Sequence, residues 1–365
     1  MRAAVCREFG EPLVIEDLDL GALSPTDVHV DIAACAVCHS DIHYAEGAWG
    51  GTLPAVYGHE AAGTVLAVGA DVTSVAVGDR VVVTLIRSCG ECDQCLRGNE
   101  VFCTATYVAD DASRLTDDDN HDVLAGMLCG AFAEEAVVDQ SQVVTIPDDM
   151  SWAVASTLAC GVITGVGAVT NTSSADANST VVVIGAGGVG LNAVQGAAIA
   201  GARAIIAVDL APEKLEIARS FGATHVATPD DAAAVIAEAT GGRSAASHVF
   251  VTVGAKPAIL AGLELLDIGG ELIIVGMPAL NNEIEVDPVN IASYGQRIIG
   301  SKMGTARIQR DIPQLISWYH EGKLKLDELV SGTYPLEDIN EAIAAVADGS
   351  VIRNVVMMED DGGAS

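Results

Sequence analysis

A glycine-rich turn, GAGGVG at residues 185–190, constrains the fold of this 365-residue chain more than any other feature. It follows the apolar run VVVI and precedes a helix-like segment, which is the strand–turn–helix context of a dinucleotide-binding motif. The first glycine permits the tight turn, the second lets a pyrophosphate approach the backbone, and the third packs the helix against the sheet. The free amides of the helix N-terminus favour phosphate. The residues predicted to hold the pyrophosphate are Gly185, Gly187, Gly188, Val189 and Gly190.

Strand-like and helix-like segments alternate after about residue 162, which predicts βαβ units and a parallel sheet. The strand Val181–Ile184 precedes the helix Leu191–Ala200, and the strand Ala204–Val208 precedes the helix Pro212–Phe221. The pattern continues with strands in HVATPD, HVFVTVG, ELIIVGM and EIEVDP, and with helices in DAAAVIAEATGG, the segment ending LLDIGG, IPQLISWYHEG and EDINEAIAAVADG. The fold class is therefore α/β, with a doubly wound parallel sheet in this part of the chain.

The first 160 residues follow a different pattern, with short apolar runs separated by Gly and Asp. Runs such as VHVDIAA, GTVLAVG and RVVVTLI predict β-strands. The acidic segment 109–122 predicts a solvated surface loop. The length of the chain and this change of pattern predict two domains.

Asp209 follows the second predicted strand, 19 residues after Gly190. A carboxylate at this place hydrogen-bonds the ribose hydroxyls of a dinucleotide and repels a 2′-phosphate. The sequence therefore predicts NAD as the cofactor, with NADP as the alternative.

Four cysteines stand close together in the string CGECDQCLRGNEVFC. They are Cys89, Cys92, Cys95 and Cys103. Four thiolates about 2.3 Å from one zinc ion require a tightly folded loop of this kind. Because four protein ligands fill the tetrahedron, the run predicts a structural zinc site with no open position for chemistry.

The net charge of −32, from 50 acidic and 18 basic residues, excludes nucleic acid and anionic membrane as expected partners. So large a charge is tolerable where salt screens self-repulsion, which predicts a very salty cytoplasm.

No leader peptide is expected, because residues 1–9 lack an apolar run. Two uncharged stretches, 152–175 and 178–202, are long enough to span a membrane, but glycines and polar residues interrupt both. In a reducing cytoplasm the clustered cysteines favour metal binding, and Cys6, Cys35 and Cys129 are expected to be buried thiols.

A second set of soft ligands lies outside the four-cysteine run. Cys38 stands in CHSDIH, His59 in GHEAAG and Cys160 in TLACGVITG. Two cysteines and one histidine form one of the ligand sets of catalytic zinc, with a fourth position left open. These three residues are far apart in the sequence, so their spacing alone does not identify a metal site. A lone cysteine is more often a buried apolar residue, and a lone histidine is more often a surface or core residue.

Taken in order, these motifs resemble the zinc-dependent medium-chain alcohol dehydrogenases over nearly the whole chain, in a form of halophilic, haloarchaeal type. The resemblance implies a GroES-like catalytic domain at 1–161 and 301–365, with a structural-zinc lobe at about 86–105. It implies a Rossmann domain at 162–300. It also implies that Cys38, His59 and Cys160 bind a catalytic zinc, and that a second zinc occupies the four-cysteine site.

The resemblance carries further roles to single positions. Glu60 resembles the acidic residue beside the metal, and Asp41 the carboxylate that orients His59. Ser40 and His43 resemble the proton relay. The remaining correspondences are His39 and Arg353 near the pyrophosphate, Lys214 near the adenine ribose, and Trp49 and Leu85 in the substrate pocket.

The expected activity is hydride transfer between a primary or secondary alcohol, or an aldehyde, and NAD(H). Alternatives within the same superfamily are a formaldehyde–thiol adduct dehydrogenase and a polyol, sugar or amino-alcohol dehydrogenase. Outside it, a zinc-binding interaction module leaves GAGGVG unexplained, and nothing in the sequence favours an inactive relative. The late strands ELIIVGM and EIEVDP lie where this family joins subunits, so a homodimer or homotetramer is expected.

Overall fold

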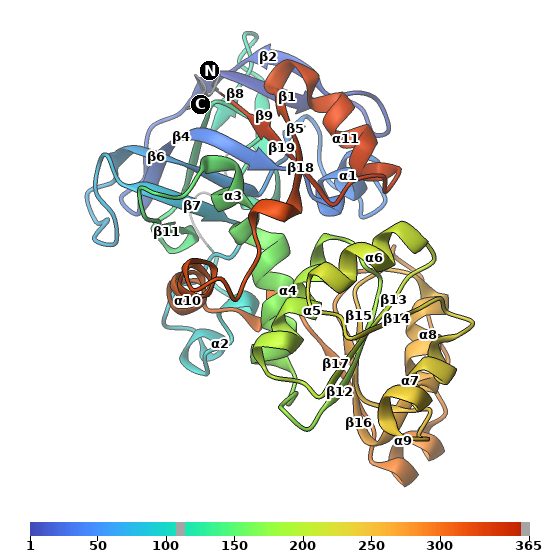
Figure 1. The fold of residues 1–365 in the computed structure, drawn as a ribbon. Coiled ribbons are helices and arrows are strands. Elements are labelled where there is room, and N and C mark those ends of the chain that lie inside the picture. Colours follow the sequence, from blue (N-terminus) through green and yellow to red (C-terminus); the bar gives the residue numbers. More distant parts are fainter. Residues whose placement is uncertain (107–113, 359–365) are drawn as a thin grey trace. The chain divides into compact units, whose positions relative to one another are not determined.

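The computed structural model describes residues 1–106 and 114–358, and these form two compact units (Figure 1). The first unit contains Met1–Cys160, Arg307–Ile316 and the chain from Leu326 onward, and the second contains Gly161–Ala306 and Ser317–Lys325. The first part of the expected acidic loop, up to residue 113, lies outside the described residues.

The main sheet of the first unit joins strands from both ends of the described chain. Its strand order is β11-β7-β6-β4-β19-β18, and β10 also pairs with β4. These strands are β4 (Asp27–Ala36), β6 (Glu60–Val68), β7 (Arg80–Thr84), β10 (Glu135–Asp139), β11 (Val143–Thr145), β18 (Val330–Pro335) and β19 (Arg353–Met357). Figure 1 shows the red strand β19 beside the blue strand β4. In this antiparallel pair Val356 stands opposite Cys35. The C-terminal segment therefore belongs to the same unit as the N-terminus.

A second sheet completes the first unit, with the order β2-β1-β5-β9-β8-β3. Its strands are β1 (Arg2–Cys6), β2 (Val14–Asp17), β3 (Asp19–Leu20), β5 (Ala55–Val56), β8 (Leu115–Thr116) and β9 (Asp122–Ala125). One hydrophobic core draws residues from both sheets, including Val5, Ile32 and Phe132. Cys6, Cys35 and Cys129 are buried in this core, as expected.

Short helices surround these sheets. They are α1 (His39–Ala45), α2 (Asp93–Leu96), η1 (Glu100–Phe102), η3 (Gly126–Leu128), η4 (Gln140–Gln142), α3 (Trp152–Thr157), η8 (Asp327–Leu329), η9 (Leu336–Asp338) and α11 (Ile339–Ala347). Helix α10 (Ile308–His320) begins in this unit and buries Ile308, Ile312, Leu315 and Ile316 along one face. Helix α1 carries four of the predicted functional residues, His39, Ser40, Asp41 and His43.

Helical structure continues from α3 through a π-helical turn η5 (Leu158–Val162), α4 (Ile163–Gly167) and a second π-helical turn η6 (Ala168–Thr172). Among the described residues, this stretch is the one helix long and apolar enough to cross a membrane, and 89% of its most apolar window is buried inside the protein. Its composition is therefore that of a core helix.

The second unit contains a six-stranded parallel sheet in the order β14-β13-β12-β15-β16-β17. Its strands are β12 (Thr180–Ile184), β13 (Ala204–Val208), β14 (His225–Ala227), β15 (Ala246–Val251), β16 (Leu266–Ile274) and β17 (Arg297–Gly300). Its helices include α5 (Gly188–Ile199), α6 (Pro212–Ser220), α7 (Ala232–Thr240), α8 (Lys256–Glu264) and α9 (Pro288–Tyr294). This is the doubly wound order with its switch point beside β12, so the predicted α/β class is confirmed.

The structure corrects three sequence expectations in this unit. Helix α5 begins at Gly188 and not at Leu191, because the glycine turn itself forms the first helical turn. The residues LLDIGG do not end a helix: α8 ends at Glu264, and β16 begins at Leu266. EIEVDP is not a strand, since Asp287 caps α9 and the edge strand is β17.

Candidate active site

Cys38 precedes the short helix α1 and occupies its N-cap position. Its backbone N–H donates to Asp41 Oδ2 at 2.9 Å, so the carboxylate three residues later closes the first turn. The side chains of Cys38 and Asp41 are both buried. The local sequence therefore fixes the Cys38 thiol at the beginning of a helix.

His59 is held by the same carboxylate. Gly58 has a φ of +89°, and a Cβ there would lie 2.5 Å from the backbone nitrogen of Phe132, so only glycine fits. Asp41 Oδ1 accepts from Gly58 N at 2.9 Å and lies 3.0 Å from His59 Nδ1. With Nδ1 engaged, Nε2 is left for a metal, and it is buried without a hydrogen-bond partner among residues 1–106 and 114–358.

Cys160 lies in the π-helical turn η5, a type of helical irregularity that is frequent at functional sites. Its thiol is buried, and its ligand atom lies within 4.8 Å of those of Cys38, His59 and Glu60. The structure therefore brings together residues that are far apart in the sequence. Two thiols, one unpartnered imidazole nitrogen and a carboxylate in a buried cluster fit a divalent metal ion, and zinc favours this donor set.

The electrostatics of the cluster favour a thiolate at Cys38 and a proton on the ring of His59. A hydrogen bond from Cys160 holds the pKa of Cys38 well below its usual value, with help from His59 and against the effect of burial. Although burial opposes a charge on His59, Asp41 and Cys38 raise the pKa of its ring well above normal. The thiolate, which is the metal-binding form of cysteine, is therefore accessible at Cys38.

Glu60 and Arg353 form a buried ion pair beside these ligands. Arg353 Nη1 lies 3.2 Å from Glu60 Oε1 and donates to the carbonyl of Val37 at 2.9 Å. Burial raises the pKa of Glu60 to about 8, while Arg353 acts in the opposite direction. Sequence reasoning named both residues but missed their pairing, because no local pattern links positions 60 and 353.

The predicted relay and pocket residues lie on and after α1. Cys38 Sγ lies 3.7 Å from Ser40 Oγ, so this hydroxyl borders the ligand cluster. The ring of His43 is 39% exposed and lies 5.0 Å from the indole of Trp49. Trp49 and Leu85 are partly buried, as pocket residues would be, whereas the predicted pyrophosphate contact His39 is exposed.

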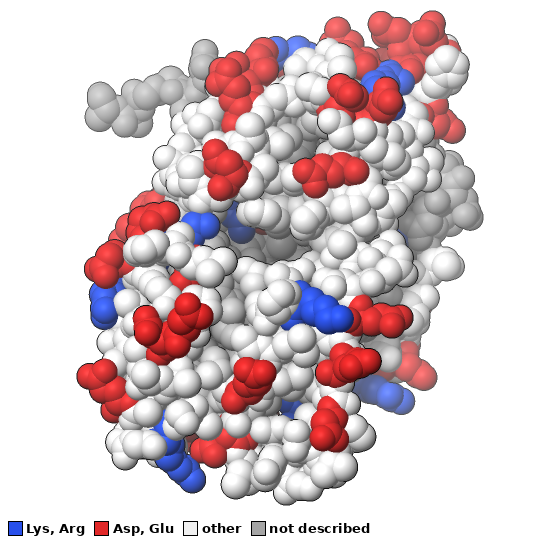
Figure 2. Space-filling model, turned by 90° about the vertical axis from the view of Figure 1, so that its right-hand side faces the viewer, with Lys and Arg blue, Asp and Glu red and all other residues white. Residues whose placement is uncertain are grey.

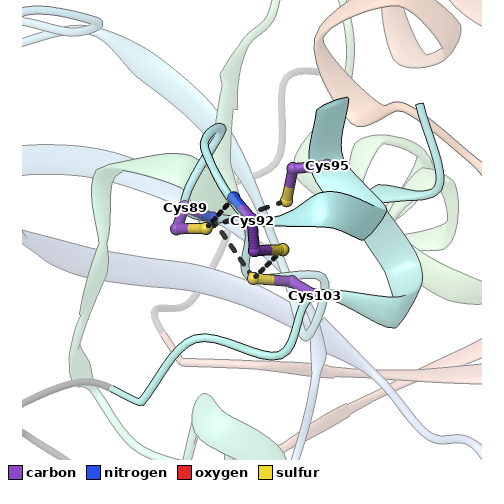
Figure 3. A group of neighbouring side chains, drawn as sticks. All are labelled: Cys89, Cys92, Cys95 and Cys103. Atoms are coloured by element: carbon purple, nitrogen blue, oxygen red, sulfur yellow. Dashed lines mark hydrogen bonds between the residues drawn. The ribbon is translucent and has the colours of Figure 1, made fainter. Parts of the chain in front are cut away.

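The four predicted zinc cysteines form a separate cluster, in which the four sulfurs face one another (Figure 3). Cys89 Sγ lies 4.0 Å from Cys95 Sγ, and Cys92 Sγ lies 3.9 Å from Cys103 Sγ. Metal–sulfur bonds of about 2.3 Å give a tetrahedron with edges of about 3.8 Å, so these spacings fit one zinc ion. Backbone hydrogen bonds from Cys95 and Thr104 lower the pKa of Cys92 to about 5. The thiolate form is therefore favoured at Cys92, whereas burial raises the pKa of Cys95 to about 12.

The glycine turn of the second unit begins directly after β12. Gly185 has a φ of +97°, and a Cβ on Gly190 would lie 1.8 Å from the carbonyl oxygen of Gly185. A Cβ on Gly187 would meet no atom within 4 Å, so the backbone is open there to a ligand. This combination of tight and open positions fits a dinucleotide pyrophosphate.

Asp209 directly follows β13 and is hydrogen-bonded to this turn. Its Oδ2 accepts from Ala186 N at 2.7 Å, and its Oδ1 accepts from Ala211 N at 2.9 Å. Lys214 lies on α6, which follows directly. Sequence reasoning gave Asp209 a contact with the ribose, but not this contact with the glycine turn.

Comparison with known proteins identifies the family. An alcohol dehydrogenase GroES-like domain matches residues 24–148, and a zinc-binding dehydrogenase domain matches residues 188–321. An NDMA-dependent alcohol dehydrogenase from Amycolatopsis methanolica is 36% identical over 371 residues, covering 99% of both chains. This chain belongs to the zinc-binding alcohol dehydrogenase family. It is therefore an oxidoreductase with a GroES-like domain and an NAD(P)-binding domain.

Two further dehydrogenases extend the comparison. S-(hydroxymethyl)glutathione dehydrogenase from Paracoccus denitrificans is 34% identical, covering 98% of this chain and 99% of its own. The crystal structure of benzyl alcohol dehydrogenase from Acinetobacter calcoaceticus matches with a TM-score of 0.89 and 30% identity, covering 98% and 99% of the two chains. This zinc-binding dehydrogenase therefore matches its relatives over nearly its full length.

Proposed function

We propose that this dehydrogenase interconverts primary or secondary alcohols with their carbonyl products, using NAD and two zinc ions per chain. Cys38, His59 and Cys160 would hold the catalytic zinc, and the four-cysteine cluster would hold the structural one. The observation that carries the proposal is the buried meeting of two thiols and an unpartnered imidazole nitrogen. The proposed catalytic domain is 1–161 with 301–365, and the proposed Rossmann domain is 162–300.

Zinc bound at this site would act as a Lewis acid on the oxygen of the substrate. Asp41 fixes the His59 ring through Nδ1, so the ring presents Nε2 to the ligand cluster. Ser40 Oγ, beside Cys38 Sγ, is placed to take the proton of a substrate hydroxyl. His43 is partly exposed and is therefore suited to exchange that proton with solvent.

The relay assignment is tested with His43→Gln. Because an external base replaces the imidazole more readily at high pH, the loss of kcat should be larger near neutral pH. An equal loss at every pH would show that His43 does not carry the proton.

We propose NAD as the preferred cofactor because the Asp209 carboxylate follows β13 at the position that meets the adenosine ribose. A 2′-phosphate would meet this negative charge at close range. His39, Lys214 and Arg353 are the proposed cationic contacts of the dinucleotide, and NADP is the weaker alternative. The specificity ratio kcat/KM for NAD over NADP measures this preference directly.

The proposed substrate pocket includes Trp49 and Leu85. The indole of Trp49 also lies 5.2 Å from the ring of Tyr44, which stacks on Tyr57 at 5.9 Å. An aromatic wall of this kind suits apolar primary alcohols, and the likeness to a benzyl alcohol dehydrogenase at 30% identity supports aromatic ones. A panel of aliphatic and aromatic alcohols followed at 340 nm tests the class.

A formaldehyde–thiol adduct is the second candidate substrate, favoured by the 34% identity to S-(hydroxymethyl)glutathione dehydrogenase. Parallel assays with benzyl alcohol and with the adduct, at the same salt concentration, decide between the two. A polyol substrate is disfavoured because Cys160 completes a two-thiol ligand set.

We propose a homodimer or homotetramer joined through the second unit. Strand β17 forms an edge of the parallel sheet, and nearby apolar side chains are exposed. These are Ile268, Val289, Tyr294 and Ile298. Light scattering of the wild type and of Ile298→Glu tests this interface, since a charge on the edge strand should favour a smaller species.

We also propose a reducing, salt-rich cytoplasm as the working compartment. No cysteine of the described residues forms a disulfide, and six of the nine cysteines lie in the two ligand clusters. Figure 2 shows carboxylates scattered over one face, with fewer lysines and arginines among them. A surface of this kind is soluble and tolerates crowding when salt screens its repulsion.

Two variants test the metal assignments together. Cys38→Ser should abolish turnover and remove one zinc per chain, while the fold persists. Cys95→Ser should remove the other zinc and lower the unfolding free energy by more than about 2 kcal/mol before it changes kcat. If Cys95→Ser abolishes kcat without loss of stability, the two sites have been assigned the wrong way round.

A further inference from the structure

Thr84 is fully buried at the end of β7 and has no assigned role. Its Oγ1 donates to the carbonyl of Ala159 at 2.8 Å and accepts from the backbone N–H of Ile86 at 3.4 Å. Threonine is common in strands, so the sequence reads as an ordinary β-former at this position. The hydroxyl nevertheless makes a specific bond to a chain segment 75 residues away.

The partner of this bond lies next to a proposed zinc ligand. Ala159 precedes Cys160 within the π-helical turn η5. Where the regular backbone hydrogen bonds of a helix are interrupted, a side chain from outside the helix commonly forms a hydrogen bond with the backbone there. The Thr84 hydroxyl therefore ties the turn that carries the Cys160 thiol to strand β7.

Thr84 also lies beside the second ligand. In the antiparallel pairing of β6 with β7, Thr84 stands opposite Glu60, the residue that follows His59. The same residue of β7 thus contacts the segment of His59 through its backbone and the segment of Cys160 through its side chain.

Gln142 forms a hydrogen bond with the backbone carbonyl of Thr84. Its side chain is buried, and its Nε2 donates to the carbonyls of Thr84 and Leu128, each at 3.0 Å. Its Oε1 accepts from Asp139 N at 3.2 Å. Both ends of the amide are therefore occupied, which fixes its orientation.

Through its contact with Leu128, Gln142 also supports the loop that precedes His59. Leu128 has a φ of +63°, which is uncommon for a residue with a side chain. Two of the residues that follow pair with the loop before His59, with Ala131 N donating to Gly58 O at 3.0 Å and Phe132 N to Tyr57 O at 2.8 Å. Gln142 therefore restrains the strained turn from which this pairing starts.

We propose that Thr84 and Gln142 are positioning residues that hold Cys160 and His59 at a metal-binding separation. The inference rests on the proposed catalytic zinc site. Metal sites tolerate errors of only about 0.2 Å in ligand distance, so ligands on distant segments need neutral, directional supports. Such supports act by fixing the positions of the metal ligands. A threonine that only filled volume in the core would not affect metal affinity in this way.

The decisive variants are Thr84→Val, which keeps the shape and removes the hydroxyl, and Thr84→Ser, which restores it. Thr180→Val is the matched control, because Thr180 is a buried strand threonine of the second unit whose hydroxyl accepts from Arg203. Each protein is loaded with Co²⁺, and its cobalt–thiolate absorption spectrum and its affinity for Co²⁺ are measured by chelator competition. The spectrum of Cys38→Ser reports the four-cysteine site alone and is subtracted.

Thr84→Val should bind Co²⁺ at the catalytic site about 10- to 100-fold more weakly, with an altered absorption spectrum. Its kcat should fall while the KM for NAD is unchanged, and Thr84→Ser should recover both metal affinity and kcat. Thr180→Val should keep the wild-type cobalt spectrum. A wild-type spectrum and affinity in Thr84→Val, or an equal change in Thr180→Val, would overturn the inference.

Two further measurements keep the outcome clear. If Thr84→Val does not fold, Gln142→Met removes the amide donors without touching the hydroxyl, and an unchanged catalytic-site affinity in that variant overturns the inference. If Cys38→Ser itself still binds two Co²⁺ ions per chain, the proposed zinc site is wrong, and the failure is distinct from that of the positioning residues.

Discussion

Arg353 Nη1 lies 3.2 Å from Glu60 Oε1, and both side chains are buried. Their strands, β19 and β6, flank β4 in the main sheet of the first unit. Arg353 also donates to the carbonyl of Val37, the residue before Cys38. Because burial disfavours the charged form of Glu60, the guanidinium compensates a carboxylate that stands next to the proposed zinc ligand His59.

Removal of Arg353 should therefore destabilise the protein strongly. Arg353→Ala leaves the Glu60 carboxylate buried without its partner, which should lower the unfolding free energy by about 3–5 kcal/mol. Urea unfolding followed by circular dichroism measures this change. Arg2→Ala is the control, because Arg2 makes ion pairs that are largely exposed, and it should cost much less. Equal losses in the two variants would contradict the compensating role of Arg353.

The parallel sheet could be predicted from the sequence because its signals are local. The strand Ala204–Val208 was predicted with the bounds that the structure gives, since a buried parallel strand is an uninterrupted apolar run. The expectation for α5 began three residues late, because glycine is a poor helix former and the turn at Gly188 reads as a loop. EIEVDP alternates like a strand but ends in an N-cap and a proline, which begin α9.

The active site was less accessible to sequence reasoning. The four-cysteine run is compact enough for its spacing to predict a metal site, whereas Cys38 and Cys160 meet only in three dimensions. Their ligand role came from the family resemblance. Thr84 and Gln142 carry no signal in the sequence, because their contribution depends on which backbone carbonyls their side chains meet in the folded chain.

Replacement of Asp209 should have two effects, since its carboxylate bonds the glycine turn as well as facing the proposed ribose site. Asp209→Gly should raise the preference for NADP relative to NAD, because the repulsive charge is gone. It should also lower kcat/KM for NAD about 10- to 100-fold, corresponding to about 1–3 kcal/mol for two lost hydrogen bonds to backbone amides.

The control for Asp209 is Asp209→Asn, which removes the charge and keeps one acceptor oxygen. It should bind NAD better than Asp209→Gly and discriminate less against NADP than the wild type. Fluorescence titration with NADH gives the Kd of each variant. An unchanged Kd for NADH in Asp209→Gly would refute the role of the carboxylate in holding the turn.

His248 should make the second unit sensitive to acid. Its Nδ1 lies 2.9 Å from Ser247 Oγ, and its Nε2 lies 3.4 Å from Glu271 Oε2 and 3.3 Å from Ser174 Oγ. Burial lowers the pKa of His248 below 6.5, although Glu271 acts in the opposite direction. The unfolded chain therefore takes up this proton first as the pH falls, and the stability present above pH 6.5 is lost as the pH falls through the folded-state pKa.

The test compares wild type and His248→Gln by differential scanning calorimetry between about pH 7.5 and pH 5.5, where histidines titrate. The Tm of the wild type should fall more steeply with pH than that of the variant. His121→Gln is the control, because the His121 side chain is 72% exposed. If His248→Gln and wild type show parallel Tm profiles, the buried histidine does not set the acid sensitivity.

The charge of −32 predicts that stability depends on salt. The screening length falls from about 10 Å at 0.1 M to about 3 Å at 1 M salt, so carboxylate repulsion on the surface weakens steeply over this range. The Tm should rise by more than about 6 °C between about 0.1 M and 3 M KCl, corresponding to about 4 kcal/mol or more for a chain of this length. Equimolar sucrose controls for preferential exclusion, which does not depend on surface charge.

A variant with four exposed acids neutralised should need less salt to reach the same Tm. Its substitutions are Glu8→Gln, Glu11→Gln, Asp118→Asn and Asp119→Asn. A flat dependence of Tm on KCl in the wild type would exclude adaptation to high salt.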